Sequence, residues 1–217
     1  MDPLGVVSEK TRRAYNLAAA RYHELFHDEM REKAYDRELL DRFARDLDGD
    51  SLVCDAGCGP SGHIGRYVFE KGIPVVGVDI SDRCVELARE TNPDMRFERC
   101  DLAGMPFPDG TFDGVIAYYS IIDTPKIHVG RLFREFHRVL VPGGVLLVAA
   151  KAGTTEGYLT ELLGIPTEIY FAFFTRDEIR RYLQEALFEV ELLEQRDPYQ
   201  SEITVERIFA MGRKRPW

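Results

Sequence analysis

The stretch VCDAGCGPSGHIG, residues 53–65, runs from an apolar strand straight into a glycine-rich loop. Gly57, Gly59 and Gly62 fit the G-x-G-x-x-G spacing that lets a strand–loop–helix unit approach a nucleotide-like ligand closely. Asp55 stands two residues before the first glycine, where a pyrophosphate would lie. Because like charges repel, a carboxylate at this point favours a ligand that carries positive charge there.

The segments around this loop alternate between strand and helix. Apolar strands are expected at 51–56, 73–80, 95–102, 111–120 and 145–151, and helices at 62–71, 82–90 and 128–140. Two further strands, 188–197 and 203–214, follow each other without an intervening helix, so they should pair antiparallel. We therefore predict an α/β fold: a Rossmann-like, doubly wound, seven-stranded sheet, mostly parallel, with an antiparallel C-terminal hairpin and helices on both faces.

A single domain over residues 1–217 accommodates these elements. We divide it into an N-terminal helical lid (1–47), a ligand-binding core (48–151), an insertion over a second pocket (152–175) and a final helix with the hairpin (176–217). Ser8 is expected to cap the first helix. The insertion is rich in Tyr, Phe, Gly and Pro, and we expect it to be partly helical.

The amino-acid composition limits the classes of partner that this protein is expected to bind. The net charge of −9 argues against a nucleic-acid binder, and the chain contains no apolar run long enough for a membrane span. The four cysteines form no C-x-x-C pair, so no metal site is expected. We expect a cytoplasmic protein that acts on a small molecule, as a monomer or a homodimer.

Three acidic residues fall at the ends of successive predicted strands: Asp55, Asp79 and Asp101. Any one of them could simply cap a helix or a turn. Asp79 lies about 20 residues beyond Gly57, the spacing at which a carboxylate binds ribose hydroxyls. That spacing suits NAD and S-adenosylmethionine equally. Asp55 favours S-adenosylmethionine, which carries a sulfonium and an ammonium group.

Four ordered stretches resemble the motifs of class I S-adenosylmethionine-dependent methyltransferases, most closely their small-molecule "type 11" branch. They are DAGCGPSG, VVGVDIS, CDLAGMPFPDGTFDGVIAYYSIID and LFREFHRVLVPGGVLLV, and the resemblance covers residues 15–151. It implies S-adenosylmethionine as cofactor and S-adenosylhomocysteine as product. The cofactor-binding residues that it implies, together with the strand-end acids, are Tyr15, Tyr22, Asp55, Ala56, Gly57, Cys58, Gly59, Asp79, Ile80, Cys100, Asp101, Leu102, Ala117 and Tyr118.

Catalysis of methyl transfer consists mainly of alignment, and a base is needed only where the acceptor must lose a proton. The candidate bases are Asp123, Tyr119, His27 and His128, with Asp123 first because it follows the fourth strand. Relatives with a similar YSIIH stretch carry histidine at that place, so an imidazole base there is excluded. Tyr118 and Tyr119 alternate along a strand, so at most one should face the site. A lid is expected from Tyr158, Phe171 and Phe173 or Phe174.

Two other functions compete with a methyltransferase. A non-catalytic binder of an adenosyl ligand would have the same fold. An NAD-dependent oxidoreductase would share the glycine loop, but Asp55, the C-terminal hairpin and the lack of a second substrate domain argue against it.

Overall fold

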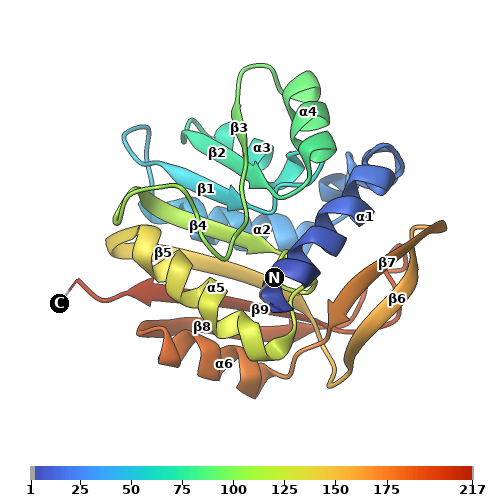
Figure 1. Cartoon of the computed structure of the whole chain (residues 1–217). Helices are drawn as coiled ribbons and strands as arrows, with labels where there is room; N and C mark the ends of the chain where they lie inside the picture. Colours follow the sequence, from blue (N-terminus) through green and yellow to red (C-terminus); the bar gives the residue numbers. More distant parts are fainter. Residues whose placement is uncertain (1–2, 217) are drawn as a thin grey trace.

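The computed structural model describes residues 3–216, and its centre is a seven-stranded sheet of order β3-β2-β1-β4-β5-β9-β8 (Figure 1). The sheet strands are β1 (Val53–Ala56), β2 (Val75–Asp79), β3 (Arg96–Arg99), β4 (Phe112–Tyr118), β5 (Leu140–Lys151), β8 (Phe188–Arg196) and β9 (Arg207–Lys214). The first five strands are parallel, and β9 is antiparallel to both β5 and β8. The predicted fold class is confirmed.

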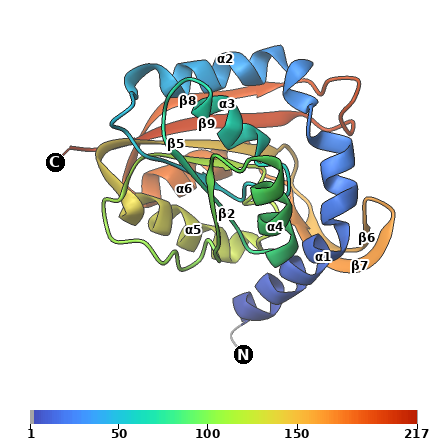
Figure 2. The same ribbon diagram turned by 90° about the horizontal axis from the view of Figure 1, so that it is seen from above.

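Helices cover both faces of this sheet (Figure 2). They are α1 (Pro3–Phe26), α2 (Ala34–Phe43), α3 (His63–Phe69), α4 (Asp82–Thr91), α5 (Lys126–Val139) and α6 (Arg176–Glu185), with short 3₁₀ turns η1 (Glu29–Arg31) and η2 (Ala44–Asp46). Successive strand residues point to opposite faces. Cys54 therefore packs with α5 and α6 in one core cluster, while Val53 packs with α2, α3 and α4 in the other.

Two local predictions were wrong. The first helix begins at Pro3 rather than after Ser8, and the buried side chains of Leu4 and Val7 explain why the first turns are held. Proline is well suited to the opening position of a helix because its missing N–H would have no partner there. A local capping signal at Ser8 could not reveal this tertiary packing.

Residues 152–175 hold a β-hairpin in place of the expected partly helical insertion. Its strands are β6 (Glu156–Leu162) and β7 (Ile165–Ala172), joined through Leu163 and Gly164, which both have positive φ. Two positive φ angles match the right-handed twist of a tight hairpin turn. Alternating β-branched and aromatic residues along β7 favour the strand.

The hairpin and α1 both lie beyond the carboxyl ends of the parallel strands (Figure 1). Helix α1 packs on β7 and α4. Arg12 holds it to Asp82 at 2.7 Å, and Lys10 pairs with Glu168 of the hairpin. Together these elements roof the edge where ligands of open α/β sheets bind. The division of the chain at residues 47, 151 and 175 stays a prediction.

Candidate functional site

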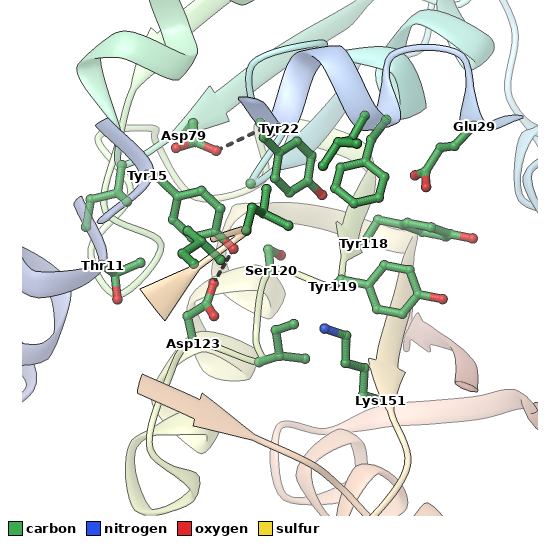
Figure 3. Close-up of a pocket in the computed structure, with 18 of the residues that line it drawn as sticks. Thr11, Tyr15, Tyr22, Glu29, Asp79, Tyr118, Tyr119, Ser120, Asp123 and Lys151 are labelled. Atoms are coloured by element: carbon green, nitrogen blue, oxygen red, sulfur yellow. Dashed lines mark hydrogen bonds between the residues drawn. The ribbon is translucent and has the colours of Figure 1, made fainter. Parts of the chain in front are cut away.

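A cavity of about 700 Å³ lies under α1, at the carboxyl ends of β1, β2 and β4 (Figure 3). Most of the residues predicted for the site line it: Tyr15, Tyr22, His27, Gly57, Gly59, Asp79, Ile80, Asp101, Leu102, Tyr118, Tyr119 and Asp123. The crossovers between parallel strands place these loops at the same edge of the sheet. Segments far apart in the sequence thus share one space.

The glycine loop forms one wall of this cavity. Gly57 and Gly59 have φ angles of +87° and +62°, which other residues rarely adopt. A Cβ on Gly57 would lie 2.3 Å from the Ser120 Cβ, so the loop and the end of β4 approach more closely than any side chain permits. The amides of Gly57 and Cys58 donate to the Val78 carbonyl, which fixes the loop on β2.

Asp79 ends β2 and faces the glycine loop. Its Oδ2 accepts from the Gly59 amide at 3.0 Å and its Oδ1 from the Ser81 amide at 2.8 Å. Burial raises the pKa of Asp79 to about 6. Each carboxylate oxygen carries further lone pairs, so the group can still accept from a ligand hydroxyl.

Asp101 and Leu102 lie beyond β3, at the far end of the same wall. The Asp101 Oδ1 accepts from the Ala103 amide at 2.9 Å, as expected of an aspartate that orders its own turn. Asp101 therefore has a structural role as well as a place in the cavity lining.

Helix α1 brings Tyr15 and Tyr22 across the cavity. The Tyr15 hydroxyl donates to Asp123 Oδ2 at 2.9 Å, and the two tyrosine ring centroids lie 6.2 Å apart (Figure 3). Burial raises the pKa of Asp123 to about 7, although the Tyr15 hydrogen bond opposes that shift. The cavity therefore contains a carboxyl group that titrates near neutral pH.

Tyr118 and Tyr119 both line the cavity, which corrects the expectation that at most one of them would. Strand β4 ends at Tyr118, and Tyr119 has a φ of +57°, so the alternation of a strand no longer applies. Tyr118 donates to the buried Asp36. The buried Tyr119 hydroxyl and Ser120 Oγ have no hydrogen-bond partner within residues 3–216.

The sequence of this chain is similar to those of known proteins. Residues 53–144 match the family described as "Methyltransferase domain". A malonyl-[acyl-carrier protein] O-methyltransferase of Pectobacterium atrosepticum is 34% identical over 110 residues, which are 51% of this chain and 41% of that protein. The 27-O-demethylrifamycin SV methyltransferase of Amycolatopsis mediterranei is 33% identical over 177 residues, 74% of this chain and 63% of that protein.

Residues 53–144 thus belong to the methyltransferase-domain family, and the chain as a whole resembles the class I S-adenosylmethionine-dependent methyltransferases. It spans less than two thirds of the length of each of these two relatives. The fold is also that of 1,6-didemethyltoxoflavin-N1-methyltransferase of Burkholderia thailandensis, a structure with bound 1,6-didemethyltoxoflavin and S-adenosylhomocysteine. The TM-score is 0.75 at 17% identity, and the match covers 99% of this chain and 92% of that one.

Asp55 does not line the cavity, contrary to the sequence argument. It is 1% exposed, and its Oδ2 accepts from the Gly65 amide at 2.9 Å. Along β1, Asp55 points to the same face as Val53, toward α3, while Cys54 and Ala56 point to the other. Burial raises the pKa of Asp55 to about 6. Its carboxylate bonds the first turn of α3 and points away from the cavity, so the geometry gives no support to its predicted role as a partner for a cationic ligand.

Four other predicted cofactor residues are also absent from the lining: Ala56, Cys58, Cys100 and Ala117. The side chains of all four are buried in the core clusters. Cys58 packs against the α3 face, and Ala117 lies inside β4. These residues are next to lining residues in sequence, but their side chains turn into the core; for Ala56 and Ala117 the alternation of a strand explains this.

The histidine and lid predictions fare differently. His27 lines the cavity, but its side chain is 48% exposed and its Nδ1 bonds the His23 carbonyl. His128 lies in the first turn of α5 and does not line the cavity. The expected aromatic lid is not there: the hairpin contributes its tip, Leu162 and Leu163, and Tyr158 is exposed.

Sequence reasoning missed several lining residues: Thr11, Glu29, Lys33, Ser120, Lys151, Glu202, Ile203 and Arg207. Lys151 had a usable signal, because it is the first charged residue after the apolar run VLLVAA and so marks a strand's carboxyl end. Thr11 and Ser120 lie in predicted elements without a signal of their own, and residues 202–207 belong to a segment whose position the sequence does not indicate. Within residues 3–216 no group of acidic, histidine or cysteine side chains could hold a metal ion, and no helix is long and apolar enough to cross a membrane.

Proposed function

We propose that this protein transfers a methyl group from S-adenosylmethionine to a small-molecule acceptor. The observation that carries the proposal is the meeting of Gly57, Gly59, Asp79 and Asp101 on one wall of a single cavity, with α1 across from them. Three successive strand ends supply that wall, as expected for an adenosyl ligand at a sheet edge.

The residues present fit such a cofactor. A Cβ on Gly59 would point toward the Tyr22 ring, 3.9 Å away, so the glycine leaves room that any other residue would fill. Ser120 and Thr11 line the cavity, and their buried hydroxyl oxygens have no hydrogen-bond partner within residues 3–216. Buried polar atoms of this kind are usually satisfied by a ligand or by water.

Each part of the wall has an assigned role. Gly57 and Gly59 would contact the methionine portion, Asp79 would accept from the ribose hydroxyls, and Asp101 with Leu102 would flank adenine. When bound, S-adenosylmethionine supplies a methyl group on a positively charged sulfur. The chain's own task is then to orient the acceptor and exclude water, which can contribute roughly 7–11 kcal/mol.

Asp123 is the candidate base. An acceptor hydroxyl or amine that attacks the methyl carbon must release a proton, and a carboxylate with a pKa of about 7 can take it near neutral pH. The Tyr15 hydroxyl holds Asp123 in place at 2.9 Å. Tyr119 and His27 remain alternatives, although burial raises the pKa of Tyr119 and His27 lies at the rim.

The part of the cavity opposite the glycine-loop wall is called the acceptor end. Its apolar and aromatic lining includes Phe26, Tyr119, Leu163 and Ile203. This lining suits a flat or apolar small molecule. The relatives named above act, by their names, on a carrier-bound malonyl group, a rifamycin and a toxoflavin precursor. The shared core therefore does not specify the acceptor. A cytoplasmic location, a monomeric or homodimeric state and the exclusion of nucleic acid stay predictions.

The two alternative functions differ in how strongly the structure opposes them. The position of Asp55 removes one reason to reject an NAD-dependent oxidoreductase, but the antiparallel β9 and the methyltransferase family match still oppose it. A non-catalytic binder of an adenosyl ligand would use the same wall and is separated only by turnover.

Calorimetric titration of the purified protein tests the cofactor, with S-adenosylhomocysteine and NADH as parallel titrants. We expect micromolar binding of S-adenosylhomocysteine and none of NADH, and the reverse would reopen the oxidoreductase reading. Labelled S-adenosylmethionine with a panel of small acceptors then tests transfer. Binding without transfer to any acceptor would favour the non-catalytic binder.

A further inference from the structure

Lys151 is a partly buried cation of the cavity. It is the last residue of β5, it lines the cavity, and its ammonium points into the space between Asp123 and Tyr119 (Figure 3). Within residues 3–216 no hydrogen bond or ion pair to its Nζ is found. Burial lowers the pKa of Lys151. Lys33 and Lys214, which are also buried, each bond to two carboxylate or carbonyl oxygens.

The charged side chains that face Lys151 from residues 33, 202 and 207 belong to one network of ion pairs. Three cations and three carboxylates form this network, and every member has an ionic partner. Lys33 pairs with Glu29 at 2.7 Å and with Glu202 at 3.1 Å. Arg196 pairs with Asp36 at 2.9 Å and with Glu202 at 2.8 Å, and Arg207 pairs with Glu202 at 3.7 Å. Lys151 makes no ion pair with any member of this network.

Asp123 is the carboxyl group that faces Lys151 from outside the network. Its Oδ2 accepts from Tyr15, and burial raises its pKa to about 7, so it is a weak counterion. The other charged groups facing Lys151 are Glu202, Arg207 and Lys33, which belong to the network.

Topology places Lys151 on the acceptor side. The proposed cofactor residues follow β1, β2 and β3, whereas β5 lies beyond β4 in the sheet. Tyr119 and Ser120, at the end of the neighbouring β4, contribute hydroxyls without partners. Lys151, Tyr119 and Ser120 therefore line this part of the cavity beside apolar side chains such as Phe26 and Leu163, and the Lys151 ammonium is the donor that points into the open space.

We propose that Lys151 binds an anionic oxygen of the acceptor, and that the acceptor is an apolar, planar organic acid with a carboxylate or phenolate group. The proposal rests on the methyltransferase function proposed above. An unpaired ammonium in a partly desolvated site is unfavourable, and a charge-assisted hydrogen bond to an anion removes that cost. Lys151 is thus a positioning and specificity residue for the acceptor.

The test compares matched probes on protein saturated with S-adenosylhomocysteine. Naphthoate is paired with naphthamide for the carboxylate, and nitrophenol with nitroanisole for the phenolate, and binding is measured by calorimetry. We expect at least one acid to bind about tenfold more tightly than its neutral partner, the size of one charge-assisted hydrogen bond. Which pair shows the preference identifies the source of the anionic oxygen.

Variants then assign the preference to Lys151. Lys151→Met should abolish it while leaving the affinity for S-adenosylhomocysteine unchanged, and Lys151→Arg should retain much of it. Lys71→Met removes a lysine that pairs with Asp41 away from the cavity and serves as the control. A preference that survives in Lys151→Met overturns the proposal.

Two further outcomes are separable. If no acid binds more tightly than its neutral partner, whether both bind or neither does, the Lys151 proposal fails and the methyltransferase function stands. If the wild-type protein does not bind S-adenosylhomocysteine at all, the proposed function itself fails.

Discussion

The two ends of the cavity are built in different ways. The wall after β1, β2 and β3 consists of residues that directly follow three strands, within residues 57–102. The opposite end is assembled from residues 26–33, the end of β4, Lys151, the hairpin tip and residues 201–207. The residues of the first end can be predicted from a local sequence pattern. The residues of the second end come from distant segments, and only the folded structure shows that they lie together.

Their electrostatics differ as well. Asp79 and Asp101 place carboxyl groups at the proposed cofactor end, whereas the proposed acceptor end has a network of ion pairs and the Lys151 ammonium, which has no ion pair within residues 3–216. A family can keep the first end for a common cofactor and change the second for each acceptor. The following predictions test whether the two ends act separately.

Gly59→Val should have the largest effect. Its side chain would occupy the space toward Tyr22, so we expect S-adenosylhomocysteine affinity to fall by a factor on the order of a hundred or more in calorimetry. Gly72→Val is the matched control, because Gly72 has a similar positive φ of +85° with nothing within 4 Å of an added Cβ. Equal losses in both variants would mean that backbone strain, not the cavity, explains the result.

Asp79→Ala should weaken S-adenosylhomocysteine binding by about tenfold or more, since it removes a charge-assisted contact to ribose. Asp82→Ala, three residues away, removes an exposed carboxylate that pairs with Arg12 and should leave the affinity unchanged. Unchanged affinity in Asp79→Ala itself would take Asp79 out of the site.

Asp123→Asn should act on the acceptor end. We expect turnover to fall by up to about tenfold while the affinity for S-adenosylhomocysteine changes little, because the base is lost and the cofactor wall is intact. Tyr15→Phe, which leaves the carboxylate but removes its hydrogen bond, should have a smaller effect on turnover. Full activity in Asp123→Asn would reduce the residue to a structural role.

The smallest effect is a pH dependence of cofactor binding. Because the pKa of Asp79 is raised to about 6, the acceptor form of its carboxylate is lost as the pH falls through that value. Affinity for S-adenosylhomocysteine should therefore be about fourfold weaker at about pH 5.5 than at about pH 7.5. Asp79→Asn should remove this dependence, and a slope that persists would point to Asp123 or Asp55, whose pKa values are raised to about 7 and about 6.

The sequence alone determined the sheet, its antiparallel end and the cofactor wall, because apolar periodicity and glycine spacing are local signals. It did not determine where side chains point. The pleat of β1 turned Asp55 onto α3, and the positive φ of Tyr119 brought two successive tyrosines to the cavity. Only the tertiary structure joined Lys151 to segments around residues 30, 120 and 202, because contacts between distant segments depend on how strands and helices pack, which no local pattern records.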